Sequence, residues 1–368
     1  MNNKKYSNVY YPVRRVSDLK DMISSSADLY KDTAAFLQKD RPGGTFMPVS
    51  YKEFKDKMDA LGTRLLDMGL AGKKVAIVGE SCWQWILTYF AVACGVGVIV
   101  PLDKNLPVDE MKNLLIRSGA SALVYTKRSE KALKPILEAS GSVEYLISMG
   151  EDTHTETVYS LDKLIEEGEH LLREGIRDYV DTEINPDAMS TLMFTSGTTG
   201  MAKGVMLSHK NIVSNVMNMS KLVSVPGYIG LSILPIHHAY EFTCDICTCL
   251  FQGATLAICE GIKYIQKNMT EVKPNVILGV PLVFEKMYKG MWKQAAGRGE
   301  AEKLRNAIDL SRKMKLYNNQ KLMKKLFKAI HQNFGNEMKL MIAGGAAIDP
   351  KVIEDFEAMG IPMIQRCV

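Results

Sequence analysis

The sequence contains no hydrophobic run long enough to cross a membrane. Its longest apolar stretch, from Trp85 to Val100, is interrupted by Thr88, Gly95 and Gly97, so it falls short of the ~20 residues that a spanning helix needs. The first residues, MNNKKYS, contain no apolar segment of the kind found in secretory signal peptides. These absences argue against a membrane-spanning or secreted protein.

Cysteine is present in a number that does not suit a disulfide framework. The 368 residues contain seven cysteines, an odd number, and most of them lie in apolar surroundings. Paired cysteines are typical of small secreted domains, whereas a long chain in a reducing compartment keeps its thiols. The sequence therefore predicts thiols and a cytoplasmic location.

Positive charge is too dilute to indicate a nucleic-acid-binding protein. The formal net charge is +5, with 24% charged and 46% hydrophobic residues, which is an ordinary globular balance. Binding to nucleic acid would require lysines and arginines gathered on one face. Because 368 residues exceed what one hydrophobic core usually supports, two or more units are expected.

Short apolar segments alternate with segments of helix length along the chain. In residues 49–65, Phe54, Met58 and Leu61 recur every three or four positions, and Ser50 stands where a helix cap is expected. Further helices are predicted at 83–94, 108–117 and 130–139, and strands at 74–79, 97–100, 122–126, 144–148, 231–234, 255–259, 276–280 and 339–343. The polar, acidic residues 150–187 are predicted to be a surface excursion between two halves. The alternation predicts an α/β protein with doubly wound, mostly parallel sheets.

One segment has the composition of a phosphate-binding loop. An apolar strand ends at Phe194, and a second apolar strand begins after Lys203 and Gly204. The loop between them begins with Thr195, Ser196, Gly197, Thr198, Thr199 and Gly200. Glycines allow successive N–H groups to face one concavity, while the hydroxyls and the Lys203 ammonium add donors and charge. The pattern predicts a cradle for phosphate oxygens.

This loop is not a Walker A motif. Ala202 occupies the position where the second glycine, counted from Gly197, would fall, and the next helix is predicted only after Ser208. On composition alone, a surface loop that binds nothing is an equal alternative.

The order of the residues resembles a known signature. Residues 195–204, TSGTTGMAKG, are similar to the signature of the adenylate-forming superfamily, which includes acyl-CoA synthetases, luciferases and peptide-synthetase adenylation domains; that family usually has proline where Ala202 stands. Residues 80–103 are similar to the N-terminal region of long-chain fatty acyl-CoA synthetases. Residues 234–241 resemble the family's Leu-Pro-x-x-His segment, and 341–350 resemble its Gly-Gly-Ala segment. The resemblance covers roughly residues 16–365.

The resemblance implies the N-terminal part of an AMP-forming acyl-CoA synthetase. The expected fold is two doubly wound, mostly parallel sheets packed with helices, without the family's barrel and C-terminal lid. Residues 66–222 are expected to form a first subdomain that carries the phosphate loop, and residues 16–65 with 228–368 a second.

The resemblance also implies the chemistry. ATP and Mg²⁺ would bind at the loop, and a carboxylic acid of the fatty acid class would attack the α-phosphate. Coenzyme A would then displace AMP from the acyl-adenylate. The resemblance places His238 beside the acyl carboxylate, and Gly345, Ala346 and Ala347 along the adenine. Taken alone, His238 is more often an ordinary polar residue than a site residue, and Gly344-Gly345 is equally an ordinary strand-to-helix turn.

After Gln365 the family continues with a Gly-Tyr-Gly-x-Thr-Glu segment, whereas this chain reads Arg366-Cys367-Val368. The chain as given is therefore expected to catalyse neither step well. Two alternatives remain open: adenylation of an acid for delivery to a carrier protein, and a non-catalytic module that binds a nucleotide or an acyl group. The oligomeric state is left open.

Two other patterns have competing interpretations. Cys244 and Cys247 have the spacing of a zinc pair, but their apolar surroundings favour buried thiols, and no resident metal site is predicted. The basic stretch 312–328 is interpreted as an amphipathic helix. It is either an ordinary solvated surface helix, which we prefer, or a weak peripheral contact with an anionic membrane.

Overall fold

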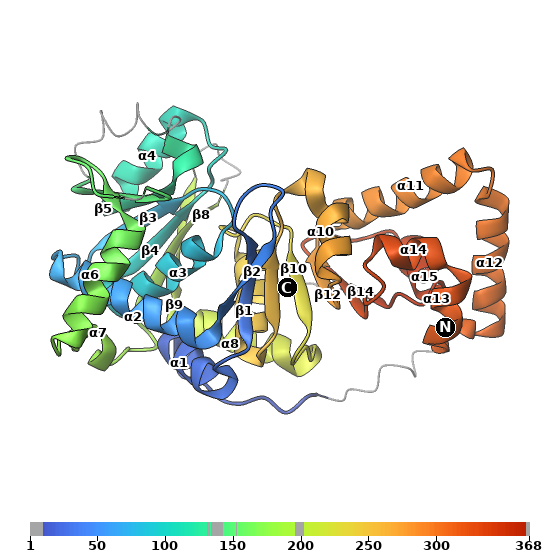
Figure 1. Ribbon diagram of the computed structural model, residues 1–368, viewed down its shortest axis with the longest axis horizontal. Coiled ribbons are helices and arrows are strands. Elements are labelled where there is room, and N and C mark those ends of the chain that lie inside the picture. The colour runs from blue at the N-terminus through green and yellow to red at the C-terminus, as the bar shows by residue number, and fades with distance from the viewer. Residues whose placement is uncertain (1–9, 131–132, 134–142, 152, 196–201, 366–368) are drawn as a thin grey trace. The chain divides into compact units, whose positions relative to one another are not determined.

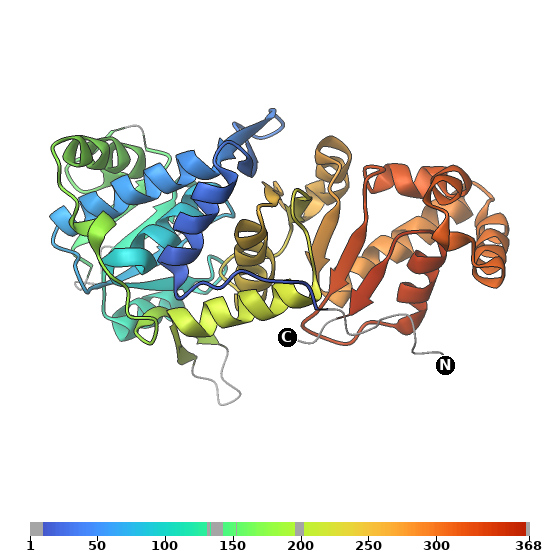
Figure 2. The same ribbon diagram turned by 90° about the horizontal axis from the view of Figure 1, so that it is seen from below.

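The computed structural model describes residues 10–130, 133, 143–151, 153–195 and 202–365. The chain forms two compact units (Figures 1 and 2). The first is drawn from Met1–Ala35, Val49–Ser224 and Leu250–Gln252, and the second from Phe36–Pro48, Val225–Cys249 and Gly253–Val368.

The first unit is built on a seven-stranded sheet with the order β7-β6-β5-β3-β4-β8-β9. Its strands are β3 (Lys74–Val78), β4 (Val98–Leu102), β5 (Ala120–Thr126), β6 (Tyr145–Met149), β7 (Tyr159–Ser160), β8 (Met189–Thr195) and β9 (Lys203–Ser208). Every recorded pairing is parallel except that of β8 with β9, which is antiparallel. The central strands are buried on both faces, which explains why they read as continuous apolar runs.

The helices of this unit are α1 (Leu19–Tyr30), α2 (Tyr51–Asp67), α3 (Trp83–Ala91), α4 (Val108–Ser118), α6 (Leu161–Arg173), α7 (Asp178–Asp181) and α8 (His209–Leu222). The predicted cap of α2 is confirmed, because the Ser50 side chain accepts a hydrogen bond from the N–H of Glu53. The buried Phe54 ring meets Phe90 of α3 edge-on, with 6.1 Å between centroids. The predicted helix 130–139 lies almost wholly outside the described residues.

The second unit contains another seven-stranded sheet, with the order β14-β13-β12-β10-β11-β1-β2. Its strands are β1 (Ala34–Lys39), β2 (Phe46–Ser50), β10 (Ile229–Ser232), β11 (Thr255–Ile258), β12 (Val276–Gly279), β13 (Leu340–Ala343) and β14 (Met363–Gln365). Pairings from β1 through β11, β10, β12 and β13 to β14 are parallel. Within the described residues neither sheet closes into a barrel, so the predicted fold class is confirmed.

The helices of the second unit include α10 (Ile265–Val272), α11 (Pro281–Gly297), α12 (Ala301–Met314), α13 (Gln320–Leu326), α14 (Lys328–Asn333) and α15 (Pro350–Ala358). A π-helical turn, η3 (Tyr240–Cys247), leads into α9 (Thr248–Gln252). Phe284 of α11, Phe356 of α15 and Met341 of β13 are buried in one core.

The division of the chain differs from the prediction in its N-terminal part. Residues 16–35 and 49–65 belong to the first unit, not to the second; only residues 36–48, which include most of β1 and β2, belong to the second unit. The physical reason is that α2 buries its apolar face against α3 and α6 of the first unit.

The predicted surface excursion at 150–187 is also wrong. It contains α6, which packs closely along α2: a Cβ at Gly168 would lie 1.9 Å from the carbonyl oxygen of Ala60. Leu161, Leu164 and Ile165 of α6 are buried. The segment is polar in composition because only one face of α6 is apolar.

The basic stretch 312–328 is not one helix. The helix α12 ends at Met314, where Lys315 adopts a left-handed conformation with φ of 55°. After a 3₁₀ turn, α13 begins with Asn319 as its cap, and α14 begins at Lys328. The side chain of Asn319 accepts a hydrogen bond from the N–H of Leu322, a capping signal that the charge pattern concealed.

Candidate functional site

The predicted phosphate loop joins two antiparallel strands of the first unit. The strand β8 ends at Thr195, β9 begins at Lys203, and the register pairs these two residues directly. Both are exposed. Ser196, Gly197, Thr198, Thr199 and Gly200 lie outside the described residues. The pairing places the backbone of Lys203 directly opposite that of Thr195.

The helix after this hairpin begins where the sequence predicted. Ser208 caps α8 and forms a capping box with Asn211, in which each side chain hydrogen bonds the other's backbone N–H. The strand β9 therefore separates the loop from the helix N-terminus, and the helix dipole does not act on the loop as it does in a Walker A motif.

Arg117 of α4 supports the hairpin, and sequence reasoning missed it. Its guanidinium donates to the carbonyl oxygen of Ala202 at 2.9 Å and lies 5.8 Å from the centroid of the Phe194 ring. Arg117 thus contacts both Phe194 of β8 and Ala202, the residue before β9. An arginine 85 positions away from Ala202 in sequence gives no local signal for this contact.

A second polar group lies at the carboxyl ends of the parallel strands in the first unit. Glu80, after β3, accepts a hydrogen bond from the Thr126 hydroxyl at the end of β5, and Lys104 Nζ lies 3.4 Å from Glu80 Oε1. Burial opposes ionisation of Glu80, but the Thr126 hydrogen bond and the Lys104 charge outweigh it and lower the pKa of Glu80. This edge of the sheet therefore carries a fixed negative charge beside a cation.

In the second unit, His238 lies in the connection that follows β10. Its side chain is exposed, and its ring centroid is 4.2 Å from that of His237. The N–H of His238 donates to the carbonyl oxygen of Pro235, which makes a tight turn. His238 therefore stands at the carboxyl edge of a parallel sheet, where ligands of α/β proteins usually bind.

The glycine segment lies at the same edge. Gly345, Ala346 and Ala347 are exposed and follow β13 directly, and Gly345 has a φ of +79°, which favours glycine. Tyr240, two residues after His238, packs onto Gly344: a Cβ there would lie 2.2 Å from the Tyr240 hydroxyl. The structure thus brings two predicted elements of the second unit together.

The cysteines near His238 do not assemble a metal site. Cys244 and Cys247 are buried, and burial raises the pKa of the Cys244 thiol to about 12, which disfavours the thiolate that zinc requires. Within the described part of the chain, no group of three or more His, Cys, Asp or Glu side chains could hold a metal ion.

Comparison with known proteins identifies the family. The model of the AMP-binding enzyme family matches residues 23–366. The chain belongs to this family. The resemblance to this family that the sequence indicated is thereby confirmed.

Several of the curated relatives are ligases of long-chain fatty acids by name. The chain is 27% identical to a chloroplastic long-chain-fatty-acid–[acyl-carrier-protein] ligase of Arabidopsis thaliana, over 93% of this chain and 54% of that protein. It is 26% identical to long-chain-fatty-acid–CoA ligase 1 of Cavia porcellus, over 85% and 47%. The chain therefore spans about half the length of the curated relatives that it matches.

Solved structures share the fold. The adenylation domain of a carboxylate reductase from Mycobacterium chelonae matches 98% of this chain and 58% of its own, with a TM-score of 0.79 and 20% identity. The N-terminal domain of FACL13 from Mycobacterium tuberculosis matches 95% and 75%, with a TM-score of 0.69 and 18% identity. A carboxylic acid reductase domain from Segniliparus rugosus, solved with AMP and a co-purified carboxylic acid, has a TM-score of 0.76 and 17% identity over 95% of this chain and 60% of its own.

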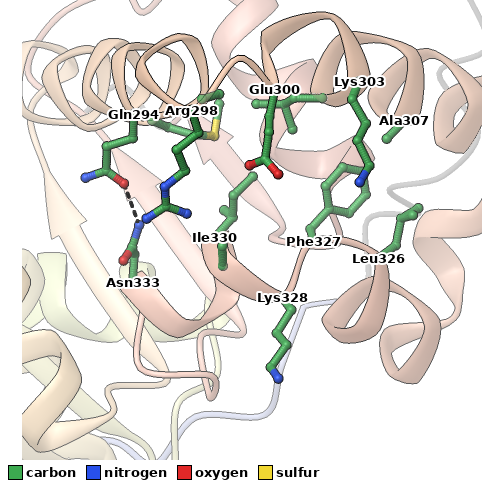
Figure 3. A pocket seen from close by; sticks show the side chains of 14 residues that line it. Gln294, Arg298, Glu300, Lys303, Ala307, Leu326, Phe327, Lys328, Ile330 and Asn333 are labelled. Carbon is green, nitrogen blue, oxygen red and sulfur yellow. Dashed lines mark hydrogen bonds between the residues drawn. The ribbon is translucent and has the colours of Figure 1, made fainter.

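A cavity of about 260 Å³ lies elsewhere in the second unit, among α11, α12, α13 and α14. Its lining includes Leu304, Phe327 and Ile330. Figure 3 shows Arg298 and Glu300 extending over Ile330. None of the predicted site residues that the structure describes lines this cavity, so it is separate from the site described above.

Proposed function

We propose that this chain takes part in the ATP-dependent activation of a fatty acid, first to an acyl-adenylate and then to an acyl-CoA thioester. The observation that carries the proposal is the hairpin of Thr195 and Lys203, with its Thr-Ser-Gly sequence, in a chain that matches the AMP-binding family over residues 23–366. The names of the curated relatives support the fatty acid class.

The proposed roles follow from chemistry and position. The Lys203 ammonium and the loop 195–200 bind the β- and γ-phosphates, and a Mg²⁺ ion bound with the ATP would neutralise part of their charge. Phosphoryl chemistry of this kind depends chiefly on positioning and on stabilisation of charge. His238 borders the acyl carboxylate, and Gly345 to Ala347 present exposed backbone to the adenine. The acid attacks the α-phosphate, pyrophosphate leaves, and the coenzyme A thiol then displaces AMP.

Delivery of the acyl group to a carrier protein is the second candidate. Its support is that one relative is named as an acyl-carrier-protein ligase. The two candidates share the adenylation step and differ only in the acceptor thiol. A non-catalytic module that binds a nucleotide or an acyl group is the third, and it predicts binding without pyrophosphate release.

We also propose a cytoplasmic location with a weak contact to anionic membranes. Among the described residues no helix is both long and apolar enough to span a bilayer. Between residues 298 and 328 the chain carries ten lysines and arginines but three aspartates and glutamates, whereas its overall net charge is +5. Leu310 and Met314 on α12 and Leu322 and Leu326 on α13 are 37–61% exposed in this stretch. Exposed apolar side chains among cations favour an anionic lipid surface.

The deciding experiment separates the steps. Isotope exchange between pyrophosphate and ATP, measured with fatty acids of increasing chain length, reports adenylation; thioester formation is then measured with coenzyme A and with a carrier protein. Exchange that requires a fatty acid supports the proposal. Nucleotide binding without exchange, in a protein extended to the full length of its relatives, contradicts it.

A further inference from the structure

Two acidic side chains are buried in the turn that follows His238. Glu241 and Asp245, four residues apart in η3, are 0% and 4% exposed. In the described part of the chain neither carboxyl forms an ion pair with a lysine, arginine or histidine. Because a buried carboxylate without a counterion is costly, burial raises the pKa of both carboxyls, and that of Glu241 is raised further by Asp245.

Glu241 closes the loop that carries His238. Its carboxyl accepts a hydrogen bond from the hydroxyl of Ser232, the last residue of β10. Ser232 and Glu241 thus flank residues 233–240. The hydrogen bond between them joins the residue after this loop to the residue before it.

The remaining oxygens of the pair are suited to a shared proton. Glu241 and Asp245 lie four residues apart in η3, close enough for each carboxyl to alter the pKa of the other. Glu241 Oε2 and Asp245 Oδ2 are buried, and no hydrogen donor lies on either in the described structure. A proton on one carboxyl satisfies both oxygens, because the O–H of an acid donates to the carboxylate beside it.

No described group next to the pair replaces that proton. The titratable side chains around the pair are Tyr240 and Cys244 of the same turn and Cys249 of α9, whose thiol lies 3.5 Å from Asp245 Oδ1. Burial raises the pKa of all three, so they are neutral near pH 7. From β10 the pair is faced by the Ser232 hydroxyl, which does not titrate.

We propose that Glu241 and Asp245 share one proton, and that this shared proton holds residues 233–240, with His238 and Tyr240, against the carboxyl end of the second sheet. The two acids are positioning residues: they act on the site through the loop. Loss of the proton to solvent leaves two adjacent buried negative charges, which repel one another and loosen the loop. The contact of Tyr240 with Gly344 transmits the change to the glycine segment.

The inference does not depend on the proposed function, because it concerns the order of a loop whether or not the chain activates an acid. Hydrogen–deuterium exchange of the 368-residue protein at pH 6.0 and pH 8.5, corrected for intrinsic rates, measures that order. We expect protection of residues 233–240 to fall about tenfold at the higher pH, as expected for a coupling of about 1.4 kcal/mol.

Two variants of Glu241 distinguish the shared proton from simple packing. In Glu241→Gln the amide accepts from Ser232 and donates to Asp245 without titrating, so the loop should stay protected at both pH values. In Glu241→Ala the loop should be unprotected at both. Glu260→Gln is the matched control, since Glu260 is a largely buried acid of the same unit with a lowered pKa; it should retain the pH dependence of the parent.

Three results would overturn the proposal: equal protection of the parent at both pH values, a pH dependence that survives in Glu241→Gln, or full protection in Glu241→Ala. If Glu241→Ala does not fold, the comparison of Glu241→Gln and Asp245→Asn with the parent decides the question alone.

Discussion

Lys203 is the one full positive charge among the predicted loop residues, and it is exposed on the first residue of β9. Lys203 forms no ion pair with any described residue. A side chain of this kind is available to a ligand rather than committed to the fold, in contrast to Arg117, whose guanidinium is already bound to Ala202.

We therefore expect Lys203→Ala to weaken ATP binding by about 10- to 100-fold, since a hydrogen bond to a charged group contributes roughly 1.5–3 kcal/mol. Titration calorimetry with ATP and Mg²⁺ measures the change. Lys221→Ala, on the exposed end of α8, removes the same charge away from the loop and should bind as the parent does. Equal ATP affinity of the two variants would mean that Lys203 does not contribute to ATP binding.

The buried acids Glu241 and Asp245 also predict how stability depends on pH. An acid whose pKa is raised by folding binds more protons in the folded state, so its contribution is present at low pH and is lost as pH rises. For Asp245 the window runs from about 4, its ordinary pKa, to about 7.

Over that window the free energy of unfolding of the second unit should fall by about 1.4 kcal/mol per pH unit for each proton involved. Urea titrations at several pH values measure the slope. The double variant Glu241→Gln with Asp245→Asn should flatten it. An unchanged slope would assign the pH dependence to other groups.

At the scale of elements, α6 and α2 show how a single glycine sets a helix contact. The backbone of α6 approaches α2 so closely at Gly168 that a Cβ would lie 1.9 Å from the Ala60 carbonyl oxygen. Backbone atoms on both sides make the contact rigid, so a methyl group must separate the helices. Gly290 in the interior of α11 is the opposite case, because a Cβ added there would meet no atom within 4 Å.

Gly168→Ala should accordingly destabilise the first unit by about 1–3 kcal/mol, the usual cost of overpacking. Gly290→Ala should stabilise the second unit by about 0.5–1 kcal/mol, because alanine has the better helix propensity. Thermal unfolding followed by circular dichroism compares the two. A neutral Gly168→Ala variant would mean that α6 can shift without cost.

At the scale of the whole molecule, two expectations remain predictions. The first is that the polypeptide 1–368 alone catalyses neither adenylation nor thioester formation well, since it spans about half the length of its relatives. Pyrophosphate exchange by this polypeptide at rates near those of a full-length relative would contradict it.

The second is the membrane contact. We expect the protein to sediment with vesicles of phosphatidylglycerol and phosphatidylcholine, but not with phosphatidylcholine alone, and to lose binding in high salt. Lys321→Glu with Lys325→Glu should reduce binding. The control pair, Lys112→Glu with Lys221→Glu, makes the same change of charge in the first unit and should not. Equal binding of both double variants would refute a specific surface.

Much of the fold was predictable because its strands are buried on both faces. Continuous apolar runs such as 74–79 and 276–280 mark β3 and β12 directly. The apolar spacing of α2 and its Ser50 cap could also be predicted, because both depend on residues close together in the sequence. In contrast, nothing local in residues 34–50 distinguishes which sheet β1 and β2 join, and the polar composition of 150–187 concealed a helix with one buried face.

By itself, the sequence determined the family, the phosphate-loop signature and the alternation of strands and helices, because each is written in consecutive residues. Only the tertiary structure decided that Arg117 supports the hairpin, that Tyr240 packs on Gly344 and that Glu241 closes the loop before it. These contacts join residues that are far apart in the chain or that belong to different elements. Their chemistry depends on distance and burial, which are properties of the folded chain and not of the order of its residues.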